Sequence, residues 1–356
     1  MISGVVYLYL AICVSLLIFN AAYIAGIQHR GRRRARRAQR WRRRFENVGT
    51  HKGLKKRTVY RLRHIEQLMA FENALEHLDA AAQEEVARAV FIENRQAVRE
   101  VALAYGKREP MERAFFAYVV ATSHPPVGEA RDPLIEILLG YLDGSTVYCR
   151  ENVLRALYRL GNLQAIEHAF DQLNEQGWYH QPHLLSDGLL ACTGNREELA
   201  KRLWNKRHSW EECLVVATVQ FATGLSESSL APSFAHSLSH ETLPLEVRFA
   251  LVRYLRRHPL PEARDELVRL LGESGPEEQE LAIVAASALA AYPAPATKTA
   301  LLDALRSRSW HVRRNAADAL RLLGVTDDDV RSVQKTGDRY AIEMLSYALS
   351  LKGGRP

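Results

Sequence analysis

The feature that most constrains this chain is a helix–turn–helix unit that recurs at a fixed period. Its best copy is LLDALRSRSWHVRRNAADALRLLG, residues 301–324. Apolar residues lie at helical spacing in both halves of the unit: Leu301, Leu302 and Leu305, then Val312, Ala316, Ala317, Leu320 and Leu323. Gly324 follows, where we expect a left-handed cap. One helix pair cannot bury both of its faces, so the unit predicts further copies stacked on either side.

The same frame appears through most of the sequence. CRENVLRALYRLG (149–161) matches the second helix of the unit without a gap, and VRFALVRYLRRHP (247–259) matches it with Pro in place of the last Gly. Looser copies end at 194, near 224 and at 293. With the three best copies, the frame endings are 161, 194, 224, 259, 293 and 324, which are 30 to 35 residues apart. This regularity predicts a stack of two-helix repeats over 61–352.

The segment VRRNAADALRLLG (312–324) resembles the second helix of a HEAT repeat. The resemblance implies an all-α fold, a right-handed α–α superhelix in which the second helices line the concave face. In HEAT proteins an Arg at the frame position of Arg150, Arg248 and Arg313 commonly pairs with an Asp of the preceding turn. Asp143 fits this role ahead of Arg150, and the other two units have no such Asp nearby.

Counting along the second helices of the three best copies places six residues on the outward stripe. On the resemblance, these are the candidate partner-binding residues: Arg155, Tyr158, Arg253, Arg256, Asp318 and Arg321. Ordinary solvated surface is an equally good interpretation, because charged side chains are usually exposed.

The N-terminal run 4–27 contains 24 residues without a charge, which is long enough to cross a hydrocarbon layer of about 30 Å. We therefore expect a transmembrane helix over 1–28, ahead of the solenoid. No basic residue precedes the run and no small-x-small site follows it, which disfavours a cleaved signal. The positive charge that follows predicts a single-pass membrane protein with its N-terminus outside and its solenoid in the cytoplasm. The four cysteines have no CxxC motif and no framework spacing, so they are interpreted as free thiols in a reducing compartment.

An Arg-rich arm follows, and with a linker it fills 29–60. Residues 29–63 hold sixteen Lys and Arg against one acid, whereas the chain after 63 has 32 basic and 40 acidic residues. Beside a membrane such an arm favours anionic lipid as a partner. A role in topology alone is an equal alternative, and nucleic acid is a third.

The candidate membrane-surface residues of the arm are Arg32, Arg33, Arg34, Arg36, Arg37, Arg40, Trp41, Arg42, Arg43, Arg44 and Phe45. Trp41 and Phe45 lie one helical turn apart and are expected to enter the lipid interface. Residues 46–60 are interpreted as a flexible joint, and 353–356 as a tail.

Sequence motifs that indicate catalysis, nucleotide binding or metal binding are scarce. The chain has no GxxxxGK[ST], GxGxxG or GxSxG motif. His236 and His240 have the spacing of two metal ligands, but a zinc site needs a third. Thr326 followed by Asp329 is typical of a helix start rather than an acidic metal site. We therefore predict no catalytic, cofactor or metal site.

The leading hypothesis is a non-catalytic, membrane-tethered cytosolic scaffold that binds a membrane-associated protein partner. Analogy with bacterial HEAT proteins suggests a membrane enzyme, polysaccharide or transport assembly. One alternative is a HEAT-type nucleic-acid-binding or DNA-repair protein, which the net acidic repeats disfavour. Another is a HEAT-like bilin lyase, for which the sequence offers no site.

Overall fold

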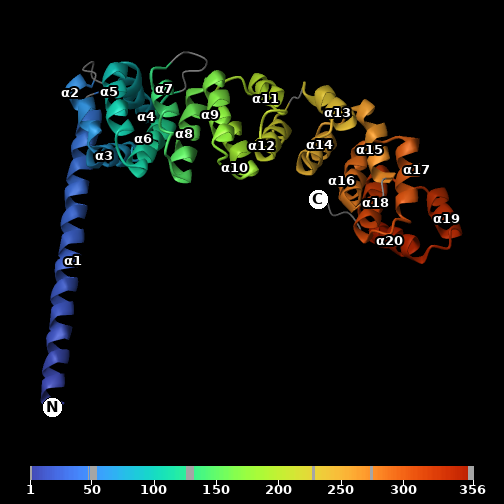
Figure 1. The fold of residues 1–356 in the computed structure, drawn as a ribbon, viewed down its shortest axis with the longest axis horizontal. Helices are drawn as coiled ribbons and strands as arrows, with labels where there is room; N and C mark the ends of the chain where they lie inside the picture. The colour runs from blue at the N-terminus through green and yellow to red at the C-terminus, as the bar shows by residue number, and fades with distance from the viewer. Residues whose placement is uncertain are drawn as a thin grey trace. The chain divides into compact units, whose positions relative to one another are not determined.

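The computed structural model describes residues 2–46, 48, 54–125, 132–226, 229–272 and 276–351. These residues form many packed helices and no strand, so the predicted all-α class is confirmed and the arrangement is compatible with a helical solenoid (Figure 1). The chain divides into two compact units, Met1–Ile166 (unit 1) and Glu167–Pro356 (unit 2). Each unit is described by itself.

Unit 1 opens with one long helix, α1 (Ile2–Phe45), whose end packs on α3. Further along, α5 packs on α6 and α7, and α8 packs on α6 and α7. The elements after α1 are α2 (Lys56–Val59), η1 (Tyr60–Arg63), α3 (Ile65–Leu75), α4 (Ala80–Ala87), the π-helix η2 (Arg88–Ile92), α5 (Arg95–Gly106), α6 (Pro110–Ser123), α7 (Leu134–Leu139) and α8 (Val147–Leu160). Helix α9 (Leu163–Glu175) follows.

Unit 2 consists of two alternating rows of helices (Figure 1). In the inner row each helix packs on the next: α10 (Pro182–Leu190), α12 (Glu212–Thr223), α14 (Leu245–Arg257), α16 (Pro276–Ala288, continued by η4, Leu289–Ala291), α18 (Trp310–Leu323) and α20 (Arg339–Ser350). In the outer row each helix packs on the inner helix that follows it: α11 (Arg196–Asn205), α13 (Ala231–His240), α15 (Arg264–Gly272, preceded by η3, Pro261–Ala263), α17 (Pro295–Ala304) and α19 (Asp327–Lys335).

The predicted repeat period is confirmed. The frame endings at 161, 194, 224, 259, 293 and 324 lie within four residues of the ends of α8, α10, α12, α14, η4 and α18. The period could be predicted because every second helix presents its apolar stripe to neighbours of the same kind.

Three helix boundaries show how local chemistry sets where these helices begin and end. Thr326 and Asp329 form the predicted capping box, in which the Thr326 hydroxyl accepts from the Asp329 amide (3.2 Å) and an Asp329 oxygen accepts from the Thr326 amide (2.9 Å). Gly161 ends α8 in the left-handed conformation, with φ 72° and ψ 15°. Gly324 has φ 82° but ψ 118°, so the left-handed helical cap predicted there is wrong, although the positive φ still favours glycine.

Buried tyrosines tie neighbouring helices together in both units. The hydroxyl of Tyr141, which follows α7, donates to the carbonyl oxygen of Ala102 in α5 (2.5 Å). The hydroxyl of Tyr292, which follows η4, donates to the carbonyl oxygen of Leu255 in α14 (2.9 Å). Burial raises the pKa of both phenols. These tyrosines therefore stay protonated as donors, and each buried phenol hydroxyl has a carbonyl partner.

The cysteines of the repeats are free thiols, as predicted. Cys149 and Cys192 are buried, and Cys213 is half-buried. Burial raises the pKa of the thiols of all three. They therefore pack as small apolar side chains and are poor nucleophiles.

The N-terminal helix requires a correction. Among the described residues, no helix combines the length and apolar content needed to cross a membrane. The prediction of a transmembrane helix over 1–28 is therefore wrong. The predicted single-pass membrane location, with the N-terminus outside and the solenoid in the cytoplasm, depended on this helix and is wrong as well. The prediction treated the uncharged run 4–27 as a separate segment, whereas the structure joins it to ten arginines in one helix, Ile2–Phe45.

The exposure of this helix is uneven. Every side chain described between 10 and 36 is exposed, including Leu17 and Phe19, and burial begins only near Ala38. Of the predicted linker 46–60, residues 47 and 49–53 lie outside the described part of the chain, as does the predicted tail 353–356.

Two leucines of α18 test the inner-row packing. Leu320 is 1% exposed and Leu322 is 50% exposed. We expect Leu320→Ala to lower the free energy of unfolding by about 2–5 kcal/mol, because it leaves a cavity between packed helices. The matched variant Leu322→Ala is expected to change it by less than about 0.5 kcal/mol. Urea unfolding followed by circular dichroism measures both, and equal effects would contradict the inner-row packing described for α18.

Candidate functional site

A groove on unit 2 brings together residues of three consecutive inner-row helices. We call it the inner-row groove, and it has a volume of about 230 Å³. Its lining comes from α14, from α16 with η4, and from α18: Arg256, Ser287, Ala290, Asn315, Asp318, Ala319, Arg321 and Leu322. Three of the six predicted partner-binding residues, Arg256, Asp318 and Arg321, thus line one site.

Polar contacts between neighbouring helices shape this groove. The Nη1 of Arg256 donates to the Ser287 hydroxyl (2.9 Å), and the Nδ2 of Asn315 donates to the carbonyl oxygen of Ile283 (2.8 Å). The Nε of Arg321 is buried and has no hydrogen-bond partner within the described residues. Buried donors are nearly always satisfied, so this N–H is a candidate for an acceptor supplied by a ligand.

The other three predicted residues lie elsewhere. Arg253 is exposed on α14, and its guanidinium lies over the Phe249 ring, 5.7 Å from the centroid. Arg155 is exposed on α8 of unit 1. Tyr158 is only 3% exposed, so its predicted outward position is wrong. Because α8 packs on both α6 and α7, its buried surface is wider than one stripe.

Two of the three arginines at the shared frame position reach back to the turn before their own helix. The Nη1 of Arg150 donates to the carbonyl oxygen of Ser145 (2.9 Å), and the Nη1 of Arg313 donates to that of Ser307 (2.7 Å). The backbone carbonyl of Asp143 accepts from Arg113 (3.1 Å). These guanidinium groups bind the turns through backbone carbonyl oxygens. The pairing of Arg150 with the Asp143 side chain stays a prediction.

The arm does not present its aromatic residues to a membrane. Trp41 and Phe45 are buried, and their ring centroids lie 5.3 and 5.6 Å from that of Phe71 in α3. Their assignment to a membrane surface is corrected because they supply core packing instead. Arg37 forms an ion pair with Glu66, and Arg42 and Arg44 are half-buried. The exposed arginines of the predicted set are Arg32, Arg33, Arg34, Arg36, Arg40 and Arg43.

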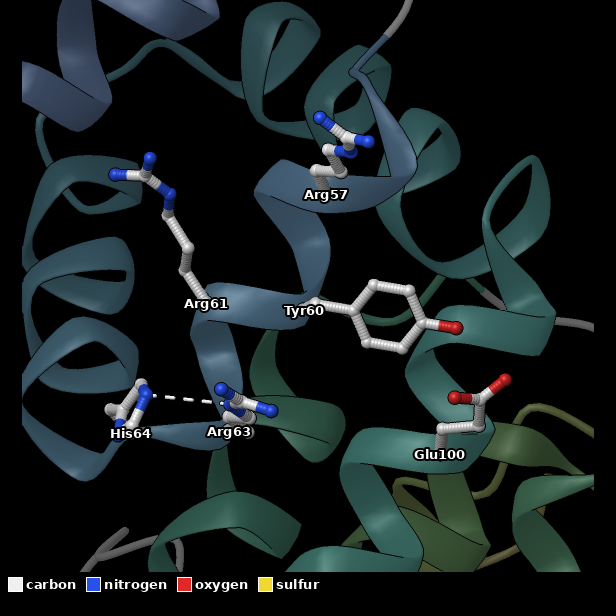
Figure 2. Close-up of a pocket in the computed structure, with 6 residues that line it drawn as sticks. All are labelled: Arg57, Tyr60, Arg61, Arg63, His64 and Glu100. Carbon is white, nitrogen blue, oxygen red and sulfur yellow. Dashed lines mark hydrogen bonds between the residues drawn. The ribbon is translucent and has the colours of Figure 1, made fainter.

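A second pocket lies in unit 1, where residues of α2 and η1 face α5 (Figure 2). We call it the basic pocket, and it has a volume of about 410 Å³. Its lining is Arg57, Tyr60, Arg61, Arg63, His64 and Glu100. Sequence reasoning missed it, although the basic excess over 29–63 was its signal, because 46–60 was interpreted as a joint without structure.

A third region, which we call the aromatic surface, lies on α18 and α20. Trp310, Tyr340 and Tyr347 are exposed there, and guanidiniums cover two of these rings. Arg314 lies over Trp310 and Arg313 over Tyr340, each 5.3 Å from the ring centroid. Trp, Tyr and Arg are enriched in the energetic centres of protein interfaces.

Glu72 of α3 and Glu76, the residue that follows this helix, lie near Tyr118 of α6. Burial, the negative charge of Glu76 and a hydrogen bond with Glu76 together raise the pKa of Glu72 to about 7. Burial also raises the pKa of Tyr118. The Glu72 carboxyl is therefore protonated at mildly acidic pH.

No metal-binding constellation occurs in the part of the chain that the structure describes, where no three His, Cys, Asp or Glu side chains cluster. His236 and His240 stack with ring centroids 4.5 Å apart, and the Nδ1 of His240 lies 3.1 Å from the carbonyl oxygen of His236. Two imidazoles alone do not complete a zinc site.

The chain matches no protein-family model and no curated protein.

The raised pKa of Glu72 generates a test of pH dependence. A carboxyl whose pKa is higher in the folded than in the unfolded state contributes stability below its ordinary value of 4.5, and loses that contribution as the pH rises through about 7. We therefore expect the thermal unfolding midpoint of the wild-type chain to fall between about pH 5 and about pH 7.5. Glu72→Gln should reduce this fall, and Glu85→Gln, at an exposed position of α4, should leave it unchanged. A pH profile identical in all three chains would contradict the assignment.

Proposed function

We propose that this chain is a non-catalytic scaffold of HEAT-type repeats that binds a protein partner in the inner-row groove. One observation carries the proposal: three residues chosen from the sequence as partner-binding, Arg256, Asp318 and Arg321, line one groove together with a buried, unpartnered N–H. An inner-row surface is also where repeat proteins of this architecture present extended binding faces.

The lining supports binding of a polypeptide. Two guanidiniums, the carboxylate of Asp318 and the amide of Asn315 offer donors and acceptors within one small groove. A backbone carbonyl or a carboxylate of the partner would satisfy the Arg321 Nε, and hydrogen bonds of charged donors are worth about 1.5–3 kcal/mol. Arginine is enriched in protein interfaces for this reason.

The same lining supports binding over catalysis. Its hydroxyl group, that of Ser287, accepts a hydrogen bond from Arg256, and the lining contains neither His nor Cys. The lining therefore offers no Ser–His or Cys–His pair for nucleophilic catalysis.

The HEAT assignment rests on the repeats themselves. The motif of 312–324 stands in α18, and the frame Arg313 holds the turn before that helix. The period of 30 to 35 residues is that of stacked helix pairs, with an outer and an inner helix in each.

Charge reversal on α14 tests the groove. Arg256 lines it, whereas its neighbour Arg257 is exposed on the same helix and is not part of the lining. We expect Arg256→Glu to reduce recovery of the partner about tenfold or more in affinity capture with quantitative mass spectrometry, because it removes a charged donor and adds a like charge beside Asp318. Arg257→Glu is expected to leave recovery unchanged, and circular dichroism should show the same helix content in both variants.

A second variant separates the groove from the aromatic surface. Trp310→Ala removes an exposed ring of that surface without touching the groove lining. Partner recovery that is unchanged by Arg256→Glu but lost with Trp310→Ala would overturn the proposal and move the binding face to α18 and α20.

A further inference from the structure

The inner-row groove and the aromatic surface meet on one side of α18. Trp310, Arg314 and Asp318 are each four residues apart, so their side chains follow one another along the same face of this helix. Trp310 and Arg314 line the aromatic surface, and Asp318 lines the inner-row groove. The two linings therefore form one continuous surface, which we call the inner-row strip.

The aromatic end of this strip holds a pocket of about 430 Å³ between α18 and α20. It is lined by three aromatic rings, a thioether and three charged side chains: Trp310, Tyr340, Tyr347, Met344, Arg313, Arg314 and Glu343. The guanidiniums of Arg314 and Arg313 lie over the rings of Trp310 and Tyr340, so positive charge stands directly beside the ring faces. Such a lining suits an apolar side chain that has an acidic residue next to it.

The charge of the strip is opposite to that of the unit that carries it. Residues 167–356 contain 25 acidic and 22 basic residues. The strip instead has four arginines and two acids: Arg256, Arg313, Arg314, Arg321, Asp318 and Glu343. Within the described residues, no carboxylate forms an ion pair with any of these four arginines, whereas Glu343 is paired with Arg339 (2.7 Å). The strip is therefore complementary to an acidic ligand.

The length of the strip sets the size of what can lie on it. Trp310 and Leu322 are twelve residues apart in α18, which corresponds to about 18 Å along the helix. An extended chain advances about 3.3 Å per residue, so about six residues join the aromatic pocket to the inner-row groove. A short segment without a fold of its own can therefore reach both ends.

We propose that the partner bound in the inner-row groove is an extended acidic segment of a protein, which continues along α18 and places an apolar side chain in the aromatic pocket. This inference rests on the function proposed above. Carboxylates of the segment pair with guanidiniums of the strip in charge-assisted hydrogen bonds. Single-stranded nucleic acid also combines stacking with positive charge, but Asp318 and Glu343 would repel its continuous row of phosphates.

Selection from a phage-displayed library of random peptides tests this chemistry on the full chain. The peptides have about twelve residues, twice the length that joins the two ends of the strip. We expect the enriched sequences to combine acidic residues with an aromatic residue or proline. Enrichment of no sequence, or of sequences with no more acidic residues than the unselected library, would overturn the inference. Partner capture with Arg256→Glu does not depend on this selection, so that outcome leaves the proposed function standing.

Fluorescence anisotropy with the most enriched peptide locates its binding. We expect Tyr340→Ala and Arg314→Glu each to weaken binding about tenfold or more, because they remove a ring of the pocket and a positive charge of the strip. The matched controls are Tyr179→Ala, at a similarly exposed tyrosine of unit 2, and Arg257→Glu, at an exposed arginine outside both linings. Both controls should bind as the wild type does, and equal thermal unfolding midpoints should confirm that the fold is kept.

The pattern of losses separates this inference from the proposed function. If Arg256→Glu weakens peptide binding but Tyr340→Ala and Arg314→Glu do not, the continuous strip is refuted and the groove stands. If only the two variants of the aromatic end weaken it, both the strip and the groove are refuted as the peptide site. A fluorescein-labelled single-stranded oligothymidylate is the second probe. Its binding to the wild type and loss with Tyr340→Ala would assign the strip to nucleic acid and overturn the inference.

Discussion

Sideways burial between neighbouring helices is the constraint on which unit 2 depends. An inner helix such as α14 packs on α12 before it and α16 after it, and α13 covers it from the outer row. Ala316 and Ala317 of α18 are fully buried, and their small side chains let adjacent backbones approach closely. The stability of such a stack is the sum of the stabilities of its repeats and of the interfaces between neighbouring repeats. The described helices of unit 2 therefore do not share one central core.

The inner-row groove follows from this packing. Arg256 on α14 is held by Ser287 of α16, and Asn315 of α18 is held by Ile283 of α16. Each of these bonds joins adjacent repeats through residues about one period apart in the chain. The site is therefore a property of the spacing between helices rather than of any one segment, and its lining is as ordered as the stack itself.

The sequence predicts the features that recur with each repeat, but not the contacts that occur only once in the fold. The repeat ends and three groove residues could be predicted, because a residue's place in the frame determines which neighbour it meets. Tyr158 was assigned to the wrong side because counting a stripe assumes one buried face, and α8 has two neighbours in the described structure. The basic pocket depends on the packing of η1 on α5, which brings Arg61 and Glu100 into one lining, and no periodicity reports such a contact.

The uncovered part of α1 has a mechanical meaning. Trp41 and Phe45 clamp the end of this helix against Phe71, whereas the described side chains from 10 to 36 are exposed. At about 1.5 Å per residue this stretch spans about 40 Å. A small rotation at these ring contacts therefore displaces the other end of the exposed stretch by an amount that grows with its length.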